Sequence, residues 1–348
     1  MRRTWILIAV VAVATAAAGI AHYADAPAVL TFALATVALA GLAWIVSFST
    51  EQVGERFGPA VTGVLQSTLG NLPEFFIVVF ALSAGELVVA RTSILGSIFA
   101  NALLVLGLVV VAGSRVSADG VMRFHPRLAK DNATLMLLAS FLIVIVGISV
   151  ASGDKASSHV EAISIVGAVA LLVTYGVWLV DYLRSDPAQE ASPHPPTVSL
   201  RVATALLAVA GVGAAFVSDW FVDALTPAMD RLGVPKAFAG LVIVGIAGNA
   251  VENTVGIVLA LKGEADLAIS VVKNSVAQIT AFLFPALVLV SLFFSTRLTF
   301  ELTAVYIGAL ALTAIALWQI TGDGEATTFE GVALVSLYVI LAVLTFYE

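Results

Sequence analysis

The sequence predicts an all-α polytopic membrane protein with about eleven transmembrane helices. Of its 348 residues, 60% are hydrophobic and only 11% are charged, whereas soluble domains carry about 25% charged residues. The mean hydropathy is +1.06, and apolar runs of roughly 18 residues or more recur along the chain, as bilayer-spanning helices require. The runs are continuous rather than alternating, which disfavours a membrane β-barrel.

The expected spans follow the apolar runs, and polar or Pro/Gly-containing segments separate them. The first run also fits a signal peptide, because Ala16-Ala17-Ala18 resembles a cleavage site, but the run continues to Tyr23 and favours an uncleaved helix. In chain order the spans are 4–24, 27–56, 59–83, 86–113, 132–151, 159–183, 199–226, 235–262, 265–295, 299–320 and 327–347.

Lys and Arg residues set the expected orientation. They concentrate in the loops on one side of the membrane, above all in the segment 115–130. By the positive-inside rule this places the N-terminus in the cytoplasm and the C-terminus outside. The expected location is a prokaryotic inner membrane.

Composition also excludes several kinds of function. The chain has no cysteine, which rules out disulfides, thiolate catalysis and Cys-ligated metals. The net charge of −7 is not gathered into acidic or basic runs, so nucleic acid is not an expected partner. No His-Glu-x-x-His motif or Ser/His pair indicates an intramembrane enzyme. We therefore expect a transporter that needs no cofactor and whose partners are the lipid bilayer and inorganic cations.

Two short segments inside apolar spans share one pattern. Gly70-Asn71-Leu72-Pro73-Glu74 and Gly248-Asn249-Ala250-Val251-Glu252 place Gly, Asn and Glu at the same spacing, 178 residues apart. The same offset pairs Gly85 with Gly263, Glu86 with Glu264 and Ser97 with Ser275. The sequence therefore predicts two repeats.

Each repeat has five spans, and because five is odd the second repeat enters the membrane from the opposite side. Such inverted repeats are typical of secondary transporters, whose sites lie where the repeats meet. The expected division is an extra N-terminal helix (1–26), a first repeat (27–183), a cytoplasmic linker (184–198) and a second repeat (199–348).

The repeated carboxylates indicate a cation site. A carboxylate at the centre of a bilayer costs at least ~2.5–3.5 kcal/mol, and here Glu74 and Glu252 repeat that cost in matching positions. Asn71 and Asn249, three residues earlier, share a helix face with them. Helix breaks at Gly70, Pro73 and Gly248 would free backbone carbonyls.

Calcium takes about 6–8 oxygen ligands, and further oxygen atoms are available on the following helices. The candidates are Ser97, Ser275, Asn101 and Gln278. Soft transition metals would require Cys or His, and the histidines fall at or near loops. A hard cation such as Ca²⁺ is therefore favoured as the transported ion.

Two close carboxylates in a low dielectric do not both ionise without a cation, so protons and the metal compete for one site. This competition is a physical basis for antiport, because the site holds either protons or the cation. The alternative is that Glu74 and Glu252 only hydrogen-bond helices together.

Further acidic residues lie near the predicted membrane surfaces. Glu51 and Glu55 are expected near the inner mouth, and Asp219 and Asp223 near the outer mouth, where they would attract cations, relay protons or complete a gate. Solvated helix ends are the alternative, and are the expectation for Glu86 and Glu264. Lys273 lies inside a span and either snorkels to the inner face or pairs with a site carboxylate.

These residues resemble the calcium/proton exchanger (CAX) family of the calcium:cation antiporter superfamily, from about residue 27 onward. The Gly-Asn-x-x-Glu cores at 70–74 and 248–252 are similar to its two signature repeats. The segment 96–107 resembles its fourth helix, and Ser275 and Gln278 match its ninth.

The resemblance implies one extra helix plus two inverted five-helix repeats, exchange of Ca²⁺ for H⁺, and a central site formed by Glu74 and Glu252. The sequence departs from the family at Leu72-Pro73, at Lys273-Asn274 and in the linker, which lacks an acidic helix. Exchange of Na⁺, K⁺ or Mn²⁺ and, from another class, a cation channel stay open as alternatives. The sodium/calcium exchanger branch is disfavoured, because its Thr- or Ser-rich signature is absent.

Overall fold

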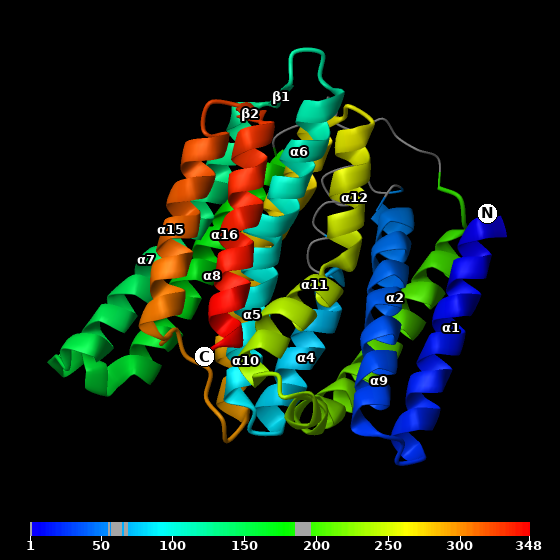
Figure 1. The fold of residues 1–348 in the computed structure, drawn as a ribbon. Helices are drawn as coiled ribbons and strands as arrows, with labels where there is room; N and C mark the ends of the chain where they lie inside the picture. The colour runs from blue at the N-terminus through cyan, green and yellow to red at the C-terminus, as the bar shows by residue number, and fades with distance from the viewer. Residues whose placement is uncertain (1, 55, 57–64, 66–68, 185–195) are drawn as a thin grey trace.

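The computed structural model describes residues 2–54, 56, 65, 69–184 and 196–348, and these are almost entirely helical (Figure 1). Within them, nine helices are long and apolar enough to cross a membrane. The prediction of an all-α polytopic membrane protein is therefore confirmed. The long helices are α1 (Arg2–Tyr23), α2 (Ala28–Gly54), α5 (Leu87–Phe99) continued by η1 (Ala100–Val105) and α6 (Leu106–Val116), α7 (Pro126–Ser152), η2 (Lys155–His159) continued by α8 (Val160–Arg184), α9 (Leu200–Leu232), α13 (Ala265–Gln278) continued by η5 (Ile279–Leu283), α14 (Phe284–Val290) and η6 (Ser291–Phe293), α15 (Ala304–Thr321) and α16 (Thr328–Phe346).

The third and eighth predicted spans differ from these continuous helices. The described part of the third is α4 (Leu72–Ser83), while residues 57–64 and 66–68 lie outside the described structure. The eighth is divided into α10 (Lys236–Phe238), η4 (Ala239–Val244), α11 (Gly245–Gly248) and α12 (Ala250–Leu261). The two spans that carry the Gly-Asn-x-x-Glu segments are thus those in which continuous helix is lost.

The helices form two outer groups with a central group between them (Figure 1). Helices α1, α2 and α9 pack chiefly on one another and stand side by side at one edge of the molecule, while α7, α8 and α15 lie at the opposite edge (Figure 1). Between them, α5, α6, α12 and α13 surround the buried interior. Many apolar side chains on the outer helices are exposed, Val13 and Val209 among them, as expected for surfaces that contact lipid.

One feature was not predicted: a short two-stranded sheet. Strand β1 (Val121–Arg123) pairs antiparallel with β2 (Glu325–Thr327), with Val121 opposite Thr327. Thr327 also caps α16 in a capping box with Glu330, which satisfies free amide groups at the start of that helix. The sheet joins the loops after α6 and α15 at one end of the molecule (Figure 1).

The backbone repeats its conformation at the predicted offset of 178 residues. Asn71 has φ/ψ of −88°/14° and Asn249 has −98°/18°. Glu86 and Glu264 each directly precede a helix, and both residues have a ψ of 65°. The preceding Gly85 and Gly263 have φ of 77° and 80°, a left-handed conformation that glycine adopts without steric cost. The π-helical segments η1 and η5 also recur at nearly this spacing. These matches support the predicted repeat.

Glycines bring α5 into backbone contact with the second interrupted span. A Cβ built on Gly96 would lie 2.3 Å from the carbonyl oxygen of Leu241, and one on Gly245 would lie 2.5 Å from the carbonyl carbon of Gly96. No side chain fits between the two backbones here, so only glycine permits this crossing. The crossing holds the ends of α5 and α11 together, next to Ser97 and Asn249.

Candidate cation site

Both Gly-Asn segments interrupt their helices, as predicted. Gly70 and Asn71 form a turn before α4, and Asn249 forms the break between α11 and α12. Pro73 lies in the first turn of α4, where its missing amide hydrogen has no consequence for the helix. An interrupted helix leaves backbone amide and carbonyl groups without intrahelical partners, and such groups build ion sites in transporters.

A buried hydrogen-bonded cluster joins three of the predicted residues. The Asn101 side-chain amide donates to Oδ1 of Asn249 (2.6 Å) and to Oγ of Ser275 (3.1 Å). It also donates to the backbone oxygen of Ser97 (3.1 Å). Asn249 in turn donates to the backbone oxygen of Gly245 (2.9 Å). Asn101 therefore ties η1 of the first half to α12 and α13 of the second.

Glu74 approaches the same region from α4. Its side chain is only 3% exposed. A Cβ built on Gly248 would lie 2.6 Å from Oε1 of Glu74 and 3.0 Å from its carboxyl carbon. The carboxylate of one Gly-Asn-x-x-Glu segment thus lies directly against the glycine of the other, and Gly248 leaves room for it.

Two oxygen atoms in this region have no hydrogen-bond partner among the residues that the structure describes. Oγ of Ser97 and Oδ1 of Asn101 are buried and make no hydrogen bond within the described part of the chain. A buried polar atom without a partner is costly in a structure. Hydroxyl and amide oxygens are the atoms that a hard cation takes as ligands. A cation with these ligands would satisfy both groups.

The remaining predicted residues are placed as follows. Asn71 and Gln278 are buried, at 5% and 4% exposure, Asn71 at the start of α4 and Gln278 at the end of α13. Glu252 lies in α12 one turn after Asn249, and its side chain falls outside what the structure describes. The meeting of the two glutamates is therefore still a prediction.

The predicted mouth acids lie far apart, on two helices that run in opposite directions. Glu51 is exposed near the end of α2. Asp219 is half-buried and Asp223 exposed, in the second half of α9. Glu55 lies outside the described residues. Their proposed roles in attracting cations or gating stay predictions.

Lys273 does not snorkel to the surface, and its pairing with a site carboxylate stays a prediction, because the Glu252 side chain is not described. Lys273 is only 5% exposed, so its ammonium group does not reach solvent. Nζ donates a hydrogen bond to Oγ1 of Thr321 at the end of α15, and Thr321 donates to the backbone oxygen of Leu317 (2.6 Å). Among the ion pairs of the described residues, none involves Lys273. The side chain points from α13 toward α15, and its described partner is a neutral hydroxyl.

A buried hydroxyl on α5, the helix that also carries Ser97, was not singled out from the sequence. Ser93 is 1% exposed, and its Oγ has no hydrogen-bond partner among the described residues. Ser93, Ser97 and Asn101 recur every four residues, and this spacing places them on one helix face. That periodicity was the available signal. It extends a line of polar side chains along α5 toward the end of the helix that Glu86 precedes.

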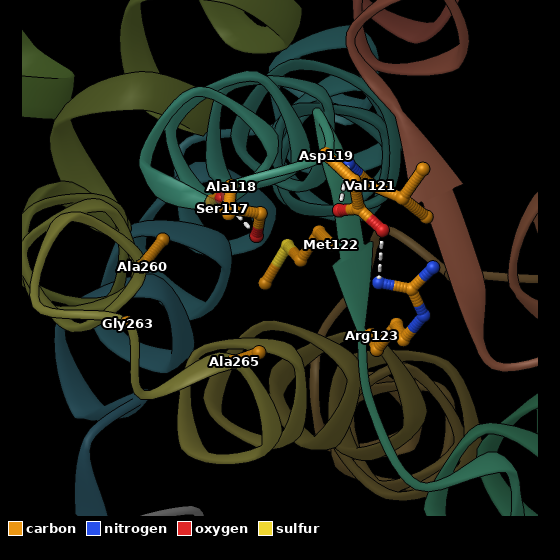
Figure 2. A pocket seen from close by; sticks show the side chains of 10 residues that line it. Ser117, Ala118, Asp119, Val121, Met122, Arg123, Ala260, Gly263 and Ala265 are labelled. Carbon is orange, nitrogen blue, oxygen red and sulfur yellow. Dashed lines mark hydrogen bonds and ion pairs between the residues drawn. The ribbon is translucent and has the colours of Figure 1, made fainter.

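One surface cavity lies away from the cluster. This cavity, of about 490 Å³, lies beside β1, and none of the predicted site residues lines it (Figure 2). At its edge Arg123 pairs with Asp119 at 2.6 Å, and this hydrogen bond lowers the pKa of Asp119 below its ordinary value. Both side chains are about half exposed, so the pair has little effect on stability.

The described residues contain no group of three or more His, Asp or Glu side chains that could hold a metal ion. The buried cluster instead offers amide, hydroxyl and single carboxylate oxygens from α4, α5, η1, α12 and α13. A site assembled at two interrupted helices from both halves of an all-helical membrane protein is characteristic of secondary transporters. The fold and the cluster thus define an integral membrane transporter.

Comparison with known proteins gives the family. The Sodium/calcium exchanger protein family matches residues 27–181 and 202–347, so the chain belongs to this family. Among its curated relatives is the Ca²⁺/H⁺ antiporter ChaA of Bacillus subtilis, 31% identical over 91% of this chain and 92% of that protein. The vacuolar calcium ion transporter of Schizosaccharomyces pombe is 32% identical over 91% of this chain and 79% of that protein.

Solved structures agree. Native YfkE is 28% identical, with a TM-score of 0.83 over 98% of this chain and 100% of YfkE. The H⁺/Ca²⁺ exchanger CAX, 14% identical, shares the fold with a TM-score of 0.76 over 100% of this chain and 93% of that protein. The predicted resemblance and the expectation of a transporter rather than an enzyme are both confirmed.

Proposed function

We propose that this protein exchanges Ca²⁺ for H⁺ across a membrane by alternating access, with Glu74 and Glu252 as the shared cation and proton site. The observation that carries the proposal is the buried cluster at the two helix breaks. There Glu74 lies against Gly248, and Asn101 connects Asn249 with Ser275. The relatives from Bacillus subtilis, Aphanothece halophytica and Synechocystis are Ca²⁺/H⁺ antiporters, which supports the same function.

The chemistry of exchange follows from charge neutrality. Ca²⁺ bound to two carboxylates and two protons bound to the same carboxylates leave the site equally neutral. Enclosing the site in the low-dielectric interior, as it changes from one side of the membrane to the other, costs far less free energy when the site is neutral than when it is charged. The site therefore changes sides when it is loaded with either ion, and an empty, doubly negative site does not. Asn71, Asn249, Ser97, Ser275, Asn101 and Gln278 complete the oxygen shell for the metal.

Proteoliposomes test the exchange directly. An imposed pH gradient should drive ⁴⁵Ca²⁺ uptake, and Glu74→Gln and Glu252→Gln should each abolish it. Glu161→Gln is the matched control, because this carboxylate is exposed and forms only a loose contact of 3.6 Å with Arg297. Uptake that persists in both site variants would contradict the assignment. A Na⁺ gradient that outperforms the pH gradient would favour another cation, and single-channel currents would favour a channel.

The serine hydroxyl allows a finer test of the ligand shell. Ser97→Ala removes a buried oxygen that has no hydrogen-bond partner in the described part of the chain, and it should weaken Ca²⁺ binding. Ser140→Ala removes a buried hydroxyl on α7 that likewise has no partner there. It should leave transport unchanged, because Ser140 is not part of the cluster. Equal effects of the two variants would show that Ser97 is not a ligand.

A further inference from the structure

Helices α1, α2 and α9 pack together as a unit, and polar contacts tie α2 to α9. Helix α2 runs along α9, and α1 packs against both. At the end where α9 begins, Oε1 of Gln52 accepts hydrogen bonds from the backbone amide (2.6 Å) and the hydroxyl (2.8 Å) of Thr197. Arg56 donates to the backbone oxygen of Val198 (2.9 Å). These contacts join the end of α2 to the start of α9.

The neighbouring seam between α5 and the second interrupted span is tightly packed. Besides the crossing of Gly96 and Gly245, a Cβ on Gly240 would lie 2.0 Å from Oγ1 of Thr92. The two helices are thus in close contact from near the start of α10 to the cluster. This packing disfavours a passage within the seam, and leaves the neighbouring boundary with α9, on the side of the α9–α10 loop, as the candidate.

A three-residue contact closes that boundary. Lys236 at the start of α10 donates to both carboxylate oxygens of Glu86, at 2.8 and 2.9 Å. Thr226 of α9 donates to Oε1 of the same carboxylate at 2.9 Å. Glu86 precedes α5, so one carboxylate joins α5, α9 and α10 at the predicted outer face.

The contact between Glu86 and Lys236 is an ion pair that is only partly exposed to water. The side chains of Glu86 and Lys236 are 25% and 33% exposed. Burial opposes ionisation of Glu86, but the hydrogen bonds from Lys236 and Thr226 outweigh it and lower the pKa of Glu86 below its ordinary value. Glu86 is therefore ionised at neutral pH, and both side chains remain within reach of water.

We propose that Glu86, Lys236 and Thr226 form a latch that holds the predicted outer side of the ion path closed, and that its release lets α9 separate from α4 and α5. Asp219, Asp223 and Thr226 recur at spacings of four and three residues, and so share one face of α9. The latch thus acts on the face that carries the predicted mouth acids. This inference rests on the proposed exchange by alternating access, and it assigns a gating role to Glu86, which the sequence led us to expect at a solvated helix end.

A single engineered thiol can report the opening, because the chain contains no cysteine. Ser218 of α9 is fully buried. It lies seven residues after Gly211, where a built Cβ would be 3.8 Å from Cδ1 of Leu72 in α4. Seven residues are two helical turns, so Ser218 also faces α4. A cysteine at this position is covered when the boundary is closed and becomes reactive when it opens.

The experiment measures labelling of Ser218→Cys in vesicles by a membrane-impermeant maleimide added from the side of the α9–α10 loop. Glu86→Gln and Thr226→Val should each raise the labelling rate about tenfold, which corresponds to ~1.4 kcal/mol. The double exchange Glu86→Lys with Lys236→Glu should restore the slow rate, because it keeps the ion pair with reversed charges. Glu161→Gln breaks another ion pair without contact to α9, and should leave the rate unchanged.

Unchanged labelling in Glu86→Gln and Thr226→Val would overturn the latch, and so would an equal increase in Glu161→Gln. Failure of the charge exchange to slow labelling would show that the ion pair is not what closes the boundary. Labelling needs no transport, so the result is separate from the proposed function. If the wild-type protein shows no ⁴⁵Ca²⁺ exchange, the proposed function is refuted. Faster labelling in the latch variants would still support the latch.

Discussion

Replacing Gly248 with alanine tests the contact between the two repeats. The added Cβ would lie 2.6 Å from Oε1 of Glu74, whereas such carbon–oxygen contacts normally measure about 3.3 Å. The oxygen must therefore move by ~0.7 Å. The displaced atom is the end of a flexible side chain rather than backbone, so the fold can accommodate the change, and alanine is itself a better helix former than glycine.

The effect should appear in cation binding. Calcium ligands lie at about 2.3–2.6 Å, so a shift of ~0.7 Å removes Oε1 from its coordination sphere. A lost contact to a charged group is worth ~1.5–3 kcal/mol, or roughly a 10- to 150-fold loss of apparent Ca²⁺ affinity. The melting temperature should change by only a few degrees, about what ~1 kcal/mol produces.

Two measurements decide the outcome: the Ca²⁺ concentration for half-maximal ⁴⁵Ca²⁺ uptake and the melting temperature. Gly308→Ala in α15 is the matched control, because nothing lies within 4 Å of a Cβ at that position, and it should alter neither. Gly245→Ala should instead lower stability, because its Cβ would lie 2.5 Å from the backbone of Gly96. Wild-type affinity in Gly248→Ala would refute the assignment of Glu74 to the site.

Three further outcomes are expected. Asn101→Leu removes the side-chain hydrogen bonds that join η1, α12 and α13, and should lower the free energy of unfolding by ~1–3 kcal/mol, as chemical denaturation can measure; an unchanged value would show that the cluster does not stabilise the fold. Thr321→Val leaves the Lys273 ammonium buried without its described acceptor and should lower the melting temperature. Lys273→Met should be neutral or stabilising, because it removes the buried charge as well. A lower melting temperature in Lys273→Met than in Thr321→Val would contradict this reasoning. The pKa of Glu86 is lowered from 4.5 by its partners, so its ion pair with Lys236 stabilises the protein above that pH and is lost as the pH falls through the lower folded-state value. The difference in melting temperature between the wild type and Glu86→Gln should therefore disappear in acid, and a difference that persists there would exclude the ion pair as its cause.

The backbone breaks were predictable because their causes are local. Gly70 and Asn71 form a turn, and Asn249 interrupts the eighth span, as the poor helix propensity of Gly and Asn indicates. Spans were equally predictable, since a bilayer requires long apolar helices whatever their neighbours are. The short β1–β2 pairing was missed, because three-residue strands depend on a partner about 200 residues away.

Sequence by itself determined the membrane class and most of the polar residues that the cluster buries, and it predicted the repeat, because periodicity and the cost of polar groups in lipid act residue by residue. The tertiary structure decided which of these residues meet. Asn101 joins Asn249 and Ser275, and Lys273 turns to Thr321. It also decided that Glu86 binds Lys236 and Thr226. The physical reason is that such contacts depend on helix crossings set by close glycine packing, as between Gly96 and Gly245, and chain spacing does not encode a crossing.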